Sequence, residues 1–170
     1  FFCNGILRMP DLAEKPHLAL CEALDGRGDW GPWSRGVVGA FRGSLKSSIC
    51  TVGFPLKQAL YKQNWACRII GASFENIKLN SNAKIRAYFE SGSAHADWLH
   101  WLYADRIPED LKGWNDRQID FVRSDPLAFP SLPFRGMESA QESWHGECGL
   151  IDDPAGAAAE KKLNVNVDAK

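Results

Sequence analysis

The chain has 170 residues, of which 45% are hydrophobic and 24% charged, so it can form one domain with extensions around a real core. No stretch approaches eighteen uncharged apolar residues, which excludes a membrane-spanning helix from our expectations. The net charge of −1 hides a basic middle, because residues 35–90 hold nine Lys or Arg and only two acids.

Residues 1–44 are predicted to form an N-terminal arm. A short helix is expected at 17–23, where leucines supply apolar contacts. The glycine-rich segment 25–29 ends it. An aromatic turn around Trp30 and Trp33 follows, and we expect it to contact a partner.

The first half of the next domain alternates between predicted strands and a helix. Residues 48–54 are rich in β-branched and apolar side chains and stop at Pro55, which predicts a strand and a turn. An amphipathic helix is expected at 56–65 and a second strand at 67–74. The Asn-Ser-Asn triplet at 80–82 predicts a turn.

The second half repeats the pattern. Apolar and polar residues alternate at 84–89, as in a half-exposed strand. A helix ending before Pro108 follows, and its Trp98 and Trp101 are expected to pack against the sheet. A last strand is expected at 118–123.

This order, β-α-β-β-α-β over residues 45–125, predicts the α+β class with a ferredoxin-like split βαβ fold. In that fold a four-stranded antiparallel sheet carries two helices on one face.

Residues 48–125 resemble an RNA recognition motif. The sequence ICTVGFP at 49–55 is similar to the family's first-strand consensus, and 82–89 lies where the third-strand consensus should be. The resemblance implies a sheet that binds RNA by stacking bases on aromatic side chains. The matching positions here are Cys50, Lys84 and Arg86, so contact through charge with RNA or an acidic partner is expected instead.

The basic residues of the middle segment are the candidate contacts for an anionic partner, and nucleic acid is the commonest such partner. A solvated basic face is the alternative, because charge runs usually have no ligand. The candidates for the anionic contact are Arg42, Lys46, Lys78, Lys84 and Arg86.

Residues 126–170 are predicted to form an extended C-terminal arm, since prolines interleave with Phe129 and Phe134. Loop aromatics in extended arms are suited to binding other proteins. Trp30, Trp33, Phe129 and Phe134 are therefore the candidate contacts with neighbouring subunits.

No catalytic residue, metal or cofactor is expected. His145 and Cys148 have ligand-like spacing, but zinc needs two further ligands and no second pair lies nearby. His95 and His100 stand too far around a helix to share a metal. An acylphosphatase has the same strand order but needs an arginine where this chain has Pro55.

The pattern as a whole predicts a non-catalytic subunit of a large assembly, in contact with protein subunits and with RNA or an acidic partner. The alternative is a purely structural accessory subunit of a respiratory or photosynthetic complex. Five widely spaced cysteines indicate a reducing compartment rather than secretion. The start at Phe-Phe-Cys fits a processed protein of a mitochondrial matrix or chloroplast stroma, or a truncation; the cytoplasm is the other expectation.

Overall fold

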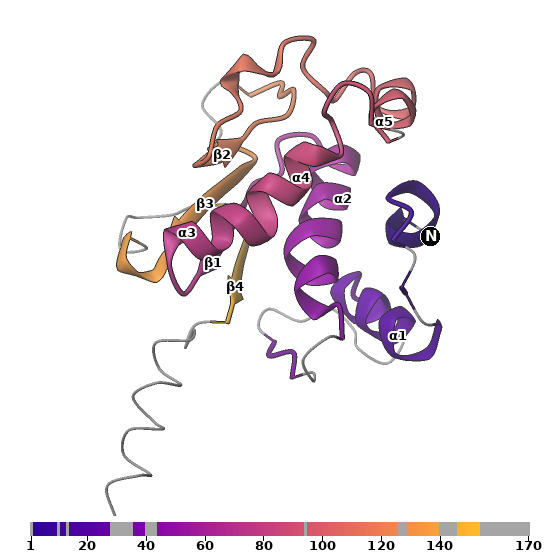
Figure 1. Ribbon diagram of the computed structural model, residues 1–170, viewed down its shortest axis with the longest axis vertical. Coiled ribbons are helices and arrows are strands. Elements are labelled where there is room, and N and C mark those ends of the chain that lie inside the picture. Colours follow the sequence, from indigo (N-terminus) through magenta and orange to yellow (C-terminus); the bar gives the residue numbers. More distant parts are fainter. Residues whose placement is uncertain are drawn as a thin grey trace, which may run out of the picture.

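The computed structural model describes residues 2–9, 11–12, 14–27, 36–39, 44–93, 95–125, 129–139 and 146–153. They form a mixed four-stranded sheet with helices packed beside it (Figure 1). The strands lie in the order β2-β3-β1-β4. Their bounds are Cys67–Gly71 for β1, Gln118–Ile119 for β2, Leu132–Gly136 for β3 and Cys148–Asp152 for β4.

The α+β class with a four-stranded sheet is confirmed, whereas the ferredoxin-like order is not. β1 pairs in parallel with both β3 and β4, and β2 pairs antiparallel with β3. The sheet is therefore mixed rather than antiparallel. Two of its strands, β3 and β4, come from the segment predicted to be an extended arm.

The central strand β1 confirms the start of the strand predicted at 67–74. Cys67 and Ile69 are fully buried, and Ile69 lies opposite Phe134 of β3 and Leu150 of β4. A nearly continuous buried run is typical of a strand with parallel neighbours on both sides. β1 ends early because the Ser73 side chain caps the next helix.

The strand predicted at 48–54 is wrong, because this segment is helical. The π-helical segment η3 (Ser48–Gly53) continues directly into α2 (Phe54–Tyr61), which takes the place of the helix predicted at 56–65. Buried apolar side chains recur every three or four residues through both segments, which is the helical period. They are Ile49, Val52, Leu56, Ala59 and Leu60.

Pro55 lies inside this helix rather than ending it. Proline has no N–H to donate, and its ring crowds the preceding turn of a regular α-helix. Here the preceding turn is wide, with the N–H of Phe54 bonded to the carbonyl of Ile49 five residues back. Wide π-turns of this kind occur as single insertions in α-helices. The proline therefore fits without breaking the helix.

The turn predicted at 80–82 and the strand predicted at 84–89 are also wrong. The chain from α3 (Phe74–Ile77) through η4 (Lys78–Asn82) to α4 (Ala83–Ala87) forms one helical run (Figure 1). Its buried positions recur every four residues, whereas Ala87 is exposed. These positions are Ile77, Ser81, Ile85 and Phe89. The two segments that resemble the RNA recognition motif are thus both helical.

The two wide turns, η3 and η4, face each other across a buried hydroxyl pair. Thr51 donates to the carbonyl of Ser47 at 2.8 Å, and the hydroxyls of Thr51 and Ser81 lie 2.8 Å apart. Since the single Thr51 hydrogen is used, Ser81 is the donor between them. Both groups are satisfied, so their burial is not a penalty.

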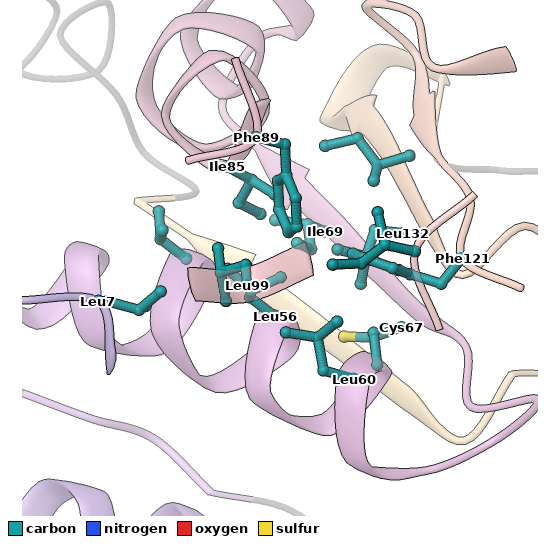
Figure 2. Packing of buried hydrophobic residues seen from close by; sticks show 14 of the residues in the cluster. Leu7, Leu56, Leu60, Cys67, Ile69, Ile85, Phe89, Leu99, Phe121 and Leu132 are labelled. Carbon is teal, nitrogen blue, oxygen red and sulfur yellow. The ribbon is translucent and has the colours of Figure 1, made fainter. Parts of the chain in front are cut away.

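The core fills the space between the sheet and the helices. Figure 2 shows Leu56 and Leu60 of α2 facing Ile69 and Leu132 of the sheet, with Ile85 and Phe89 beside them. The ring of Phe89 also lies edge-on to Trp114 and Phe121, with centroids 5.0 and 6.0 Å away. These residues form one cluster. The short helix η5 (Leu111–Gly113) precedes Trp114, and α5 (Ala96–Leu102) adds Leu99.

The N-terminal segment packs on this core instead of standing apart from it. It contains η1 (Phe2–Ile6) and α1 (Glu14–Leu24), and α1 confirms the helix predicted at 17–23. Phe2 and Leu7 are buried in the same cluster as the sheet residues. At the other end of the chain, a single turn, η6 (Met137–Ser139), follows β3.

The helical character of residues 83–87 predicts unequal effects of two substitutions. Ile85→Ala removes a fully buried side chain and should lower the free energy of unfolding by about 2–5 kcal/mol. Ala87→Gln is on the exposed side and should change it by less than about 0.5 kcal/mol. Urea unfolding of both variants measures this. A strand would bury residues 85 and 87 together, so a large loss in Ala87→Gln would contradict the helix.

Candidate functional site

The predicted basic residues that the structure describes lie at separate places rather than on one surface. Arg42 lies outside the described residues, and Lys46 is half-buried one turn before Cys50. Lys78 and Arg86 both face Asp116, with the Lys78 Nζ 2.8 Å from one carboxylate oxygen and an Arg86 nitrogen 3.4 Å from the other. Part of the predicted anion-binding charge is therefore already matched by an acid of this chain.

The two basic neighbours change the pKa of the Asp116 carboxyl. The hydrogen bond from Lys78, with the nearby charges of Lys78 and Arg86, holds the pKa of the Asp116 carboxyl below its usual value. The same bond raises the pKa of Lys78. The Lys78, Arg86 and Asp116 side chains are all accessible to water, so their ion pairs contribute little to the free energy of unfolding. Their main effect is on the net charge of this part of the surface.

Lys84 lies apart from this pair, at an open pocket of about 440 Å³ between the N-terminal segment and the helices. Arg8 and His95 also line the pocket, together with the acid Asp11. Lys84 makes no ion pair with any residue that the structure describes. This pocket is where the described basic side chains come closest to forming a place for an anion.

The predicted aromatic contacts divide into three outcomes. Trp30 and Trp33 lie outside the described residues. Phe129 is partly exposed, and its carbonyl accepts a hydrogen bond from Arg123. Phe134 was predicted to contact a neighbouring subunit, which is wrong, because it is fully buried in β3 opposite Ile69. An extended proline-flanked segment can be a sheet strand as readily as a surface arm.

The exposed aromatic residues lie on α5 instead. Trp98 is 53% and Trp101 74% exposed, and their rings stand edge to face with centroids 6.0 Å apart. The prediction that they pack against the sheet is wrong: Leu99, on the opposite side of α5, makes the inward contact and is fully buried. Large apolar side chains left in water in this way mark contact surfaces.

The exposed face of α5 continues onto α2. Tyr61, at the end of α2, is 57% exposed, and its ring lies 5.7 Å from that of Tyr103. A pocket of about 380 Å³ lies between them and is lined by Ile6, Trp98 and Leu102, among others. We call Tyr61, Trp98, Trp101 and Leu102 the tryptophan surface. Sequence reasoning missed it, although helical spacing at positions 98, 101 and 102 was visible.

A third pocket, of about 410 Å³, lies between η1, α1 and the start of α2. Cys3 and Cys21 both line it. Lys57 bridges from α2 to Asp25 just after α1, with both oxygens of the carboxylate 2.6 Å from its Nζ. This ion pair holds α1 against the rest of the protein.

The described residues show neither a metal-ion site nor a membrane-spanning helix. They contain no group of three or more His, Cys, Asp or Glu placed to hold a metal ion. They also include no helix that is long and apolar enough to cross a membrane.

Comparison with known proteins adds no relative. No family model matches the chain, and neither a curated protein nor a solved structure matches it.

The Lys78–Asp116 bond predicts a specific change in titration. Lys78→Met should raise the pKa of the Asp116 carboxyl toward its ordinary value, because the main group that stabilises the ionised form is gone. Lys84→Met, on the same helix, should leave it unchanged. Carbon-detected NMR titration measures both, and equal shifts in the two variants would contradict the assignment.

Proposed function

We propose that this protein is a non-catalytic subunit of a larger protein assembly and that the tryptophan surface is its docking face. The observation that carries the proposal is the exposure of two adjacent tryptophans on one short helix. Tryptophan and tyrosine are the residues that most often dominate binding energy at protein interfaces. The placement of the assembly in an organelle stays a prediction.

The surroundings of the tryptophan surface indicate the chemistry of its partner. Two exposed acids lie close to this surface in the chain, Asp97 on α5 and Asp105 three residues after α5. A central apolar patch with a charged rim is the usual anatomy of a protein interface. The partner suited to this face is a protein with an apolar groove edged by Lys or Arg.

Contact with RNA is the second candidate. The observation that favours it is the pocket that Lys84 and Arg8 both line, where Lys84 makes no ion pair with a described acid. Against it, Lys78 and Arg86 share Asp116, which lowers the net charge that helix presents. Nucleic-acid affinity depends on the number of phosphates neutralised, so the one positive charge that Asp116 offsets matters.

The docking proposal predicts that replacing both tryptophans releases the protein from its assembly. The combined Trp98→Ser and Trp101→Ser variant should bind at least about thirtyfold more weakly, because an interface residue that dominates binding contributes about 2 kcal/mol or more. The measurement uses the tagged full chain isolated from its source cells, with assembly size followed on native gels. Circular dichroism checks that the variant folds.

A matched control uses Leu79, which is 63% exposed but lies on η4. Leu79→Ser should leave the assembly intact. The absorbance ratio at 260 and 280 nm of the isolated assembly tests the second candidate. If Lys84→Glu with Arg86→Glu released the chain together with nucleic acid, and the tryptophan variant did not, the docking proposal would be overturned.

A further inference from the structure

Four of the five cysteines meet in two pairs that sequence spacing did not reveal. The thiol of Cys3 on η1 donates a hydrogen bond to the sulfur of Cys21 on α1. Cys67 of β1 and Cys148 of β4 are direct register partners on neighbouring strands. The two members of each pair are far apart in the chain and adjacent in space.

We propose that Cys3 and Cys21 form a reversible dithiol–disulfide site that tethers η1 to α1. The two thiols interact, both residues line the same open pocket, and Cys21 is only partly buried. Thiol–disulfide exchange needs one accessible thiolate and a second thiol within reach of it. This pair has both.

The position of Cys3 is fixed by Gly53. A Cβ atom at residue 53 would lie 2.5 Å from the Cys3 sulfur, a distance at which one of them must move. Glycine inside a helix costs about 0.5–1 kcal/mol relative to alanine, so a buried glycine in η3 needs a compensating contact. The bare backbone of Gly53 provides the space in which the Cys3 sulfur sits against η3.

The surroundings make Cys21 the attacking group. The hydrogen bond from Cys3 lowers the pKa of the Cys21 thiol to about 7, with help from Lys57 and against the opposing effects of burial and Asp25. Burial raises the pKa of Cys50 to about 11, so that thiol stays protonated. In the other pair Cys67 is fully buried. Cys21 therefore carries thiolate near neutral pH where Cys50 does not.

The reaction uses a small disulfide, such as oxidised glutathione, as the oxidant. The Cys21 thiolate attacks one sulfur of it, forming a mixed disulfide and releasing one small thiol after protonation. Cys3 then loses its proton to solvent and attacks the Cys21 sulfur, which forms the Cys3–Cys21 bond and releases the second small thiol. Two protein thiols are oxidised while one disulfide is reduced to two thiols.

The test treats the reduced full chain with oxidised glutathione near neutral pH, followed by alkylation, trypsin digestion and mass spectrometry. Cleavage after Arg8 separates the two cysteines, so the bond joins two peptides. We expect a Cys3–Cys21 link as the dominant product, formed at least about tenfold faster than any glutathione adduct on Cys50, since the rate follows the thiolate fraction. A stable mixed disulfide on Cys21, or equal reaction at Cys50, would overturn the proposal.

Single variants separate the two roles. Cys3→Ser should stop at the mixed disulfide on Cys21, and Cys21→Ser should leave Cys3 unreacted in the folded protein. Linking Cys3 to Cys21 should also raise the Tm by roughly 5–10 °C, because a short loop is closed in the unfolded chain. An unchanged Tm in the linked protein would show that the bond does not stabilise the packing of η1 against α1, which would contradict the proposed tether.

A second variant tests the geometry separately from reactivity. Gly53→Ala should slow closure of the Cys3–Cys21 bond, since the new methyl group displaces the Cys3 sulfur. The same change in a Cys3→Ala background should not lower the Tm, because the clash is absent and alanine is favoured over glycine inside a helix. If Gly53→Ala closed the bond at the original rate, the placement of Cys3 would be wrong.

Discussion

The parallel pairing of β1 with β3 and β4 is the constraint on which the rest of the structure depends. Parallel neighbours cannot be joined by tight turns, so the chain between β1 and β3 must cross from one end of the sheet to the other. That crossing contains the helical run 74–87, α5 and β2. It covers the buried strand β1 and leaves one side of α5 in solvent.

The helices that cover β1 are held together through their wide π-helical turns, η3 and η4. Each contains a wide turn, and these turns meet at the Thr51–Ser81 hydroxyl pair. The first turn also accommodates Pro55 and presents Gly53 to the Cys3 sulfur. One local departure from regular helix geometry thus serves both the core and the N-terminal segment.

Sequence patterns predicted the elements whose signal is local, but not the sheet. β1, α1 and α5 follow from short-range periodicity and were predicted near their observed positions. Residues 48–54 and 84–89 were misassigned because β-branched content and a short alternation outweighed the longer helical spacing of Ile49, Val52 and Leu56. The partners of β1 lie some sixty and eighty residues away, and no local pattern specifies such a pairing.

The exposed aromatic residues lie elsewhere than the aromatic contacts predicted from the sequence. Aromatic contact with other proteins was expected from Trp30, Trp33, Phe129 and Phe134, yet the exposed aromatic face described here belongs to α5. Helical spacing alone cannot say which side of a helix with apolar residues all round faces the core. The thiol pairs were equally hidden, because spacing along the chain does not report proximity in space.

Residues 5 and 6 of η1 line the pocket beside the tryptophan surface, so the N-terminal segment borders that surface. Hydrogen–deuterium exchange, compared between the purified chain and the chain within its native assembly, tests the proposed docking face most directly. Added protection should appear in α5 and at Tyr61, with little change over residues 78–86. Protection concentrated on residues 78–86, with none on α5, would contradict the account.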